Sequence, residues 1–198
     1  RDQGFYHGVS NLLLQFAKFF HSYQFERVLG NTLILSFYSL AASFPLSILM
    51  ALAINLVRRT GFKKFVQTVS YMPYFISVVV LVGILNQVLS PVVGIYGGVY
   101  RLFCGSGYPP DILANAGTFR HLYVWSGIWQ SLGWNTIIYL AALSSVDLEL
   151  HEAAQLDGAN RLKRVVYIDL PILLPTAAIM LILSVGSLMS VGFDKAYL

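Results

Sequence analysis

Four long stretches without a charged residue constrain the fold of this chain more than any other feature of its sequence. No Asp, Glu, Lys or Arg occurs in 32–57, 65–90, 121–146 or 170–193. Each stretch exceeds the ~20 residues that an α-helix, rising ~1.5 Å per residue, needs to cross a ~30 Å hydrocarbon layer. One such stretch could be a buried core helix, but a chain of 198 residues cannot cover four of them. We therefore predict an all-α membrane protein with four transmembrane helices.

The overall composition agrees with this prediction. Hydrophobic residues make up 57% of the chain and charged residues 11%, against roughly 25% charged in ordinary soluble domains. The net charge of +4 comes from cations that gather in clusters beside the predicted spans. Because such clusters orient membrane proteins, we interpret the charge as a topology signal and expect no nucleic-acid partner.

The basic clusters predict which connections face the cytoplasm. The connection 58–64 carries four cations and no acid, and 147–171 carries a second basic cluster, whereas 91–120 has only Arg101 and Arg120 as cations. By the positive-inside tendency, the first two connections are cytoplasmic and 91–120 is extracytoplasmic. This outer loop is rich in Gly, Pro and Tyr, and we expect either a docking or entrance surface for an external partner or a plug packed on the helix ends.

The cytoplasmic connection 147–171 predicts a helical elbow. Asp147 is placed to cap a short helix, Gly158 breaks that helix, and Asn160 is placed to cap a second one. Pro171, with a second proline four residues later, then opens the last span, where a missing N–H costs least. We expect the two short helices to lie across the inner face of the membrane.

The first helix of this elbow has a surface suited to contact with another protein. Ala153, Ala154 and Gly158 form a flat face that permits close approach. Glu152 and Asp157 on its rim could pair with cations on a partner.

The residues of the elbow resemble a known family. The elbow contains Glu152-Ala153-Ala154, then three residues, Gly158, nine residues, Ile168, one residue and Leu170-Pro171. This pattern resembles the EAA loop of ABC-importer permeases. A chance Glu-Ala-Ala would explain the tripeptide alone. Chance would not explain why every residue of the longer pattern is present at the family's spacing. Nor would it explain why the pattern lies in the cytoplasmic connection before the penultimate helix, which is its place in the family.

The resemblance extends over nearly the whole chain. Asn31-Thr32, Tyr71-Met72-Pro73 and Gly192-Phe193-Asp194 are similar to segments of carbohydrate-importer permeases, especially the lipoprotein- and alginate-type oligosaccharide and polysaccharide branch. The core of these type I importers has six helices. Residues 1–198 would then be a single partial permease domain that supplies four of them, with one more helix expected before Arg1 and one after Leu198.

The resemblance implies a function and a set of partners. The chain would be the permease subunit of an ATP-driven, binding-protein-dependent importer of oligosaccharides or polysaccharide fragments in a bacterial or archaeal cell membrane. It would pair with a second permease, similar or identical, and receive solute from an extracytoplasmic binding protein. The coupling residues that would enter a groove on a cytoplasmic ATPase are Glu152, Ala153, Ala154, Asp157 and Gly158.

ATP hydrolysis is expected in that partner ATPase, together with its ATP and Mg²⁺. The chain has no Gly-x4-Gly-Lys-Ser/Thr phosphate loop. We therefore expect no enzymatic activity and no cofactor in this subunit.

Polar residues inside the spans are the candidates for solute contact, because lipid offers them no hydrogen bonds. In the third span Gln130, Ser131 and Trp134 follow helical spacing, and an amide beside a flat ring suits a sugar. By the resemblance, Tyr74 and Ser184 are further candidates. The alternative for all five is helix–helix hydrogen bonding or packing.

Other functions are also compatible with parts of the sequence. The solute of an importer could instead be an amino acid, a peptide or another small polar molecule. A secondary transporter would also have charge-free spans but would not need the elbow pattern. A membrane-embedded enzyme is disfavoured because the spans hold no acid and the four histidines are scattered at edges and loops, so we expect no metal site.

Overall fold

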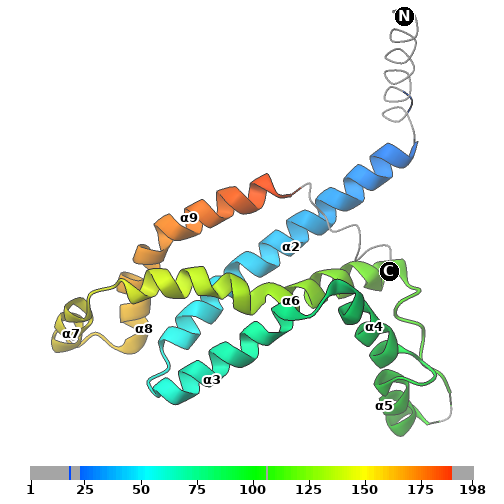
Figure 1. The fold of residues 1–198 in the computed structure, drawn as a ribbon, viewed down its shortest axis with the longest axis horizontal. Helices are drawn as coiled ribbons and strands as arrows, with labels where there is room; N and C mark the ends of the chain where they lie inside the picture. Colours follow the sequence, from blue (N-terminus) through cyan, green and yellow to red (C-terminus); the bar gives the residue numbers. More distant parts are fainter. Residues whose placement is uncertain (1–17, 19–22, 106, 189–198) are drawn as a thin grey trace, which may run out of the picture.

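The computed structural model describes residue 18, residues 23–105 and residues 107–188, and every regular element in this part is helical (Figure 1). Gly192-Phe193-Asp194 lies outside the described residues. The helices are α2 Tyr23–Asn55, α3 Thr60–Tyr71, α4 Val78–Leu89, α5 Ile95–Cys104, α6 Ala116–Ser144, α7 Leu148–Leu156, α8 Arg161–Arg164 and α9 Leu170–Gly186. A 3-10 turn, Met72–Phe75, follows α3, and a π turn, Val165–Asp169, joins α8 to α9.

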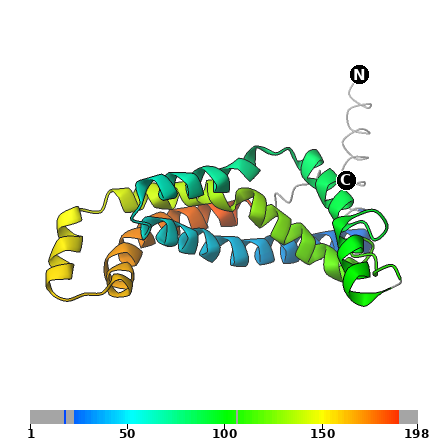
Figure 2. The same ribbon diagram turned by 90° about the horizontal axis from the view of Figure 1, so that it is seen from below.

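Three long helices, α2, α6 and α9, form the central bundle (Figures 1 and 2). Its larger buried cluster consists of Ala51, Leu52, Tyr139, Leu143, Leu173 and Ala177. A smaller cluster consists of Leu35, Val124 and Ile128. Small residues such as Ala51 and Ala177 let helices approach closely, as is usual where van der Waals packing rather than water exclusion holds helices together.

Three of the four predicted spans have counterparts among the candidate spans of the described residues, one of them only as a bent pair. Among the described residues, two helices are long and apolar enough to cross a membrane, 25–55 and 161–186. The second predicted span, 65–90, is not one straight helix, because segments 60–75 and 78–89 differ in direction by 97°. This bent pair is a third candidate span if it crosses as one unit. The helix α6 has the length, at 29 residues, but polar side chains such as Gln130 lower its hydropathy.

Local chemistry explains the bend in the second span. Pro73 lacks an N–H and begins the 3-10 turn. The Ser77 hydroxyl then accepts a hydrogen bond from the Val80 N–H at 3.3 Å, which caps α4. In the gap between the two helices, the Ile76 carbonyl accepts a hydrogen bond from the Gln130 side-chain amide at 2.6 Å. Because the break frees backbone groups that lipid cannot satisfy, the amide from α6 stabilises it.

The segment predicted as an extracytoplasmic loop is folded. The helix α5 packs on α4, and the Arg101 guanidinium donates to the carbonyls of Gly97 and Val92. The Tyr96 hydroxyl donates to the Pro110 carbonyl at 3.3 Å. Its apolar surface is nevertheless open, with side chains such as Leu102 and Phe103 more than four-fifths exposed. The loop therefore combines internal order with an exposed apolar face.

Candidate functional site

The predicted elbow is present and its turn has defined chemistry. Gly158 has φ = +78°, a left-handed conformation that glycine adopts without steric cost. The Ala159 N–H donates to the Ala154 carbonyl at 2.9 Å, and the Gly158 N–H donates to the Gln155 carbonyl at 3.1 Å. Together these bonds form a Schellman motif that ends α7. The Asn160 side chain accepts a hydrogen bond from the N–H three residues later at 2.8 Å, which caps α8 as predicted.

Two details of the elbow differ from the prediction. Asp147 occupies the N-cap position of α7, but its side chain makes no capping hydrogen bond. The last span also does not begin at its prolines, because 161–186 is one continuous helix that includes the π turn. In a regular α-helix the Pro171 ring would clash with the carbonyl four residues earlier. The wider π turn directly before Pro171 relieves this clash, so the helix continues on the N-terminal side of the prolines.

The surface of the elbow is exposed. Four of its five predicted contact residues are exposed and Ala154 is half-buried; the exposed ones are Glu152, Ala153, Asp157 and Gly158. Large apolar side chains accompany them, including Leu148 and, at the tip of α7, Leu156, which is 90% exposed. Exposed apolar side chains rimmed by charges are typical of a protein–protein contact.

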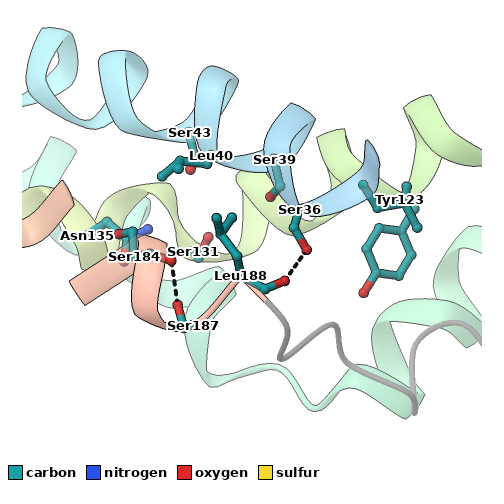
Figure 3. Close-up of a pocket in the computed structure, with 11 residues that line it drawn as sticks. Ser36, Ser39, Leu40, Ser43, Tyr123, Ser131, Asn135, Ser184, Ser187 and Leu188 are labelled. Atoms are coloured by element: carbon teal, nitrogen blue, oxygen red, sulfur yellow. Dashed lines mark hydrogen bonds between the residues drawn. The ribbon is translucent and has the colours of Figure 1, made fainter. Parts of the chain in front are cut away.

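A polar pocket of about 280 Å³ lies between α2, α6 and α9 (Figure 3). Its serine hydroxyls come from all three helices: Ser36, Ser39 and Ser43 on α2, Ser131 on α6, Ser184 on α9 and Ser187 just after it. The Asn135 amide adds a further polar group, and no charged side chain of the described residues lines the pocket. The pocket is therefore neutral and rich in hydrogen-bonding groups.

Three serines of this pocket, Ser131, Ser184 and Ser187, donate their hydroxyl protons to backbone carbonyls. Ser131 donates to the Gly127 carbonyl at 2.8 Å, and Ser184 donates to the Met180 carbonyl at 2.7 Å. Ser187 donates to the Ser184 carbonyl at 2.9 Å (Figure 3). This local bonding is how serine is accommodated in an apolar helix. It leaves the oxygen lone pairs free to accept hydrogen bonds, so the pocket suits a ligand rich in donors, such as a sugar hydroxyl.

The other predicted solute contacts lie in a second place, beside the bend between α3 and α4. The Trp134 ring stacks on the Tyr74 ring with 4.5 Å between centroids and 4° between planes. Phe75 meets both rings edge-on, at 6.3 Å from Trp134 and 6.0 Å from Tyr74. Both stacked rings are over two-fifths exposed. The side chain of Gln130 contacts the same bend, since it holds the Ile76 carbonyl.

The structure thus divides the predicted solute residues between two places. Ser131 and Ser184 line the serine pocket, whereas Tyr74, Gln130 and Trp134 gather at the bend. Gln130 and Ser131 are adjacent on α6, and their side chains face different neighbours in the structure. Sequence reasoning missed the serines of α2 and Asn135. Their signal was present, since serines at 36, 39 and 43 fall on one face of a charge-free span.

These features define an all-helical membrane protein with a neutral polar pocket among its long helices and an exposed helical elbow at one end. Residues 43–191 match the family described as the binding-protein-dependent transport system inner membrane component, and the chain belongs to that family. The resemblance of the elbow and spans to importer permeases is thereby confirmed.

Individual relatives agree with this membership. The chain is 41% identical over 186 residues to the polygalacturonan/rhamnogalacturonan transport system permease protein YteP of Bacillus subtilis strain 168, covering 94% of this chain and 57% of that protein. It is 37% identical over 183 residues to protein LplB of the same organism, covering 92% and 57%. The chain thus spans a little over half the length of these relatives.

Solved structures show the same fold. A bacterial ABC transporter involved in the import of the acidic polysaccharide alginate superposes with a TM-score of 0.84 at 39% identity, covering 90% of this chain and 62% of that chain. The alginate transporter in complex with an alginate pentasaccharide-bound periplasmic protein also superposes with a TM-score of 0.84, at 40% identity and the same coverage.

Proposed function

We propose that this chain is the core of the permease subunit of an ABC importer for oligosaccharides or polysaccharide fragments. The exposed elbow carries the proposal, because it presents the complete Glu-Ala-Ala to Leu-Pro pattern on a defined helix–turn–helix beside a helix long enough to span a membrane. Family membership supports the importer function. The names of YteP and of the alginate transporter support the carbohydrate class.

In this function the chain acts with several partners in a bacterial inner membrane. Cytoplasmic ATP-binding subunits hold ATP and Mg²⁺ and hydrolyse the nucleotide. A second permease subunit completes the pathway, and an extracytoplasmic binding protein delivers the solute. The bent pair and α6 also cross the bilayer, with α6 packed against α2, α9 and α3.

The elbow is the coupling element of this proposal. Glu152 and Asp157 meet cations on the ATPase, while Ala153 and Gly158 let the two surfaces approach closely. The exposed Leu156 supplies apolar contact area at the tip. The closing of the ATPase pair on ATP then moves both elbows and switches the pathway between its two faces.

Solute recognition combines two kinds of contact. Ser131 and Ser184 offer acceptor lone pairs in the serine pocket. Tyr74 and Trp134 offer a flat apolar surface against which the face of a sugar ring packs. The amide of Gln130 is held by the Ile76 carbonyl, so Gln130 contacts solute through its oxygen while its nitrogen maintains the bend.

The test is reconstitution of the full-length chain with its co-encoded permease, ATPase and binding protein in liposomes. ATP hydrolysis is measured with the binding protein empty, loaded with oligogalacturonate or alginate fragments, and offered maltose as a control sugar. We expect stimulation by a loaded binding protein and uptake that requires ATP. Uptake without ATP would favour a secondary transporter. Stimulation only by an amino acid or peptide would show that the solute is not a carbohydrate.

A further inference from the structure

The helix α7 stands apart from the bundle. Figures 1 and 2 show it at one end of the molecule, beyond the ends of the long helices. The structure describes α7 in full, and none of its residues is buried or belongs to either apolar cluster. A helix that projects in this way transmits a push to the bundle only through its two connections and through the few contacts of its side chains.

Among the described residues, a single contact between ionisable side chains joins α7 to another helix. His151 Nε2 lies 3.2 Å from Asp169 Oδ1, an ion-pair distance rather than an aligned hydrogen bond. Asp169 is the last residue of the π turn that leads into α9, and it is only 3% exposed. Among the described residues its Oδ1 has no hydrogen-bond partner, so the contact with His151 is the pairing that this oxygen has.

The surroundings of Asp169 show why this contact is a defined one. A buried carboxylate is costly unless it is paired. Arg58, Arg161 and Arg164 line the same pocket of about 410 Å³, which lies between the end of α2, the elbow and the start of the last span. None of these guanidinium groups comes within ion-pair distance of Asp169 in the described structure, and the Arg164 Nε is itself buried without a hydrogen-bond partner. His151 alone brings α7 to the carboxylate.

We propose that the His151–Asp169 contact is the latch through which α7 moves the last span. The inference rests on the proposed function, in which α7 receives the motion of the ATPase. Because 161–186 is one continuous helix, a displacement at Asp169 is carried along α9. The far end of α9 places Ser184 in the serine pocket, roughly four turns from Asp169. The latch therefore links the elbow to the proposed solute site, with His151 and Asp169 as positioning residues.

The test compares His151→Ala, Asp169→Asn, their double variant and the exchange His151→Asp with Asp169→His in the reconstituted full complex. Gln155→Ala is the matched control, because Gln155 lies on α7 and lines the same pocket without an ion pair or hydrogen bond to Asp169. The measured quantity is solute imported per ATP hydrolysed. We expect this ratio to fall roughly five- to tenfold in each single variant, within the usual range of coupling between sites.

The double variant is expected to be no worse than a single one, and the exchange is expected to restore part of the ratio, because contacting groups are not additive. Unchanged ratios in both single variants would overturn the latch. So would loss of ATPase assembly in His151→Ala, because His151 would then be a docking contact. If the wild-type complex itself does not respond to loaded binding protein, the proposed function fails, whatever the variants do.

A second measurement does not depend on transport or on the folding of Asp169→Asn. With the exposed Cys104 replaced by Ser, a spin label at Gln155→Cys reports the mobility of α7 in the full-length chain. His151→Ala is expected to increase that mobility, because the helix loses its contact with Asp169. Unchanged mobility would overturn the latch even if transport is impaired.

Discussion

Gly133 is a position where a single added methyl group should destabilise the packing of two helices. It lies in α6 at a close approach to α3, where an added Cβ would be 2.0 Å from the Ser70 carbonyl oxygen. A carbon and a carbonyl oxygen in contact are about 3.3 Å apart. Gly133→Ala therefore requires the two helices to separate locally by about 1.3 Å, or an equivalent distortion of the backbone.

The expected loss of stability follows from two opposing effects. Overpacking of this kind costs about 1–3 kcal/mol. Because the clash is with backbone atoms, the upper part of the overpacking range, about 2–3 kcal/mol, applies here. The higher helix propensity of alanine offsets somewhat less than ~1 kcal/mol of this loss of stability. The net loss of about 1–2 kcal/mol should lower Tm by roughly 2–8 °C for a chain of this size. Gly83→Ala is the control, because nothing lies within 4 Å of its added Cβ, and it should be neutral or stabilising.

Thermal unfolding of the full-length protein in detergent, followed by tryptophan fluorescence, measures both variants. Trp134 lies one residue from Gly133, so its emission also reports whether its stack on Tyr74 is disturbed. A Tm for Gly133→Ala equal to or above that of the wild type would refute the close approach of α6 to α3. A decrease of equal size in Gly83→Ala would show that the effect is not specific to this contact.

Three further variants test individual parts of the proposed site. Gly158→Ala should weaken coupling because a non-glycine residue at φ = +78° costs about 1–2 kcal/mol, and Gly158→Asn should cost less. Hydrogen exchange measures the strain, and equal protection of α7 in the wild type and Gly158→Ala would show that the turn is not strained. Trp134→Ala should raise the KM for solute while Trp134→Phe largely preserves it, since an aromatic stack contributes about 0.5–1.5 kcal/mol. Ser184→Ala should raise KM by roughly fivefold through loss of one acceptor, and an unchanged KM would remove Ser184 from the solute site.

Local chemistry made the elbow predictable from the sequence. Gly158 ends α7 and Asn160 caps α8 through bonds to residues within five positions along the chain. Such turns depend on neighbours that the sequence places together. The capping role of Asp147 was the exception, since it sits at the N-cap without making the bond.

Non-local contacts made the rest less predictable. A charge-free stretch has the same composition whether its helix is straight or bent, and the bend at Ile76 is stabilised by Gln130, 54 positions away in the sequence. The serine pocket likewise depends on three helices meeting. Ser131 and Ser184 could be selected individually, but their convergence with the serines of α2 required the fold. The start of the last span depends on the π turn before Pro171, and no local sequence pattern predicts that turn.

The claim that the elbow couples ATP hydrolysis to solute movement is tested most directly at Glu152. In the reconstituted full-length complex, ATP hydrolysis is measured with empty and loaded binding protein for the wild type, Glu152→Gln and Glu152→Lys. Because Glu152 is exposed and has no hydrogen bond or ion pair to another described residue, neither variant should affect insertion into the membrane. We predict that stimulation falls in Glu152→Gln and is lost in Glu152→Lys. Full stimulation in Glu152→Lys would contradict the coupling role of the elbow.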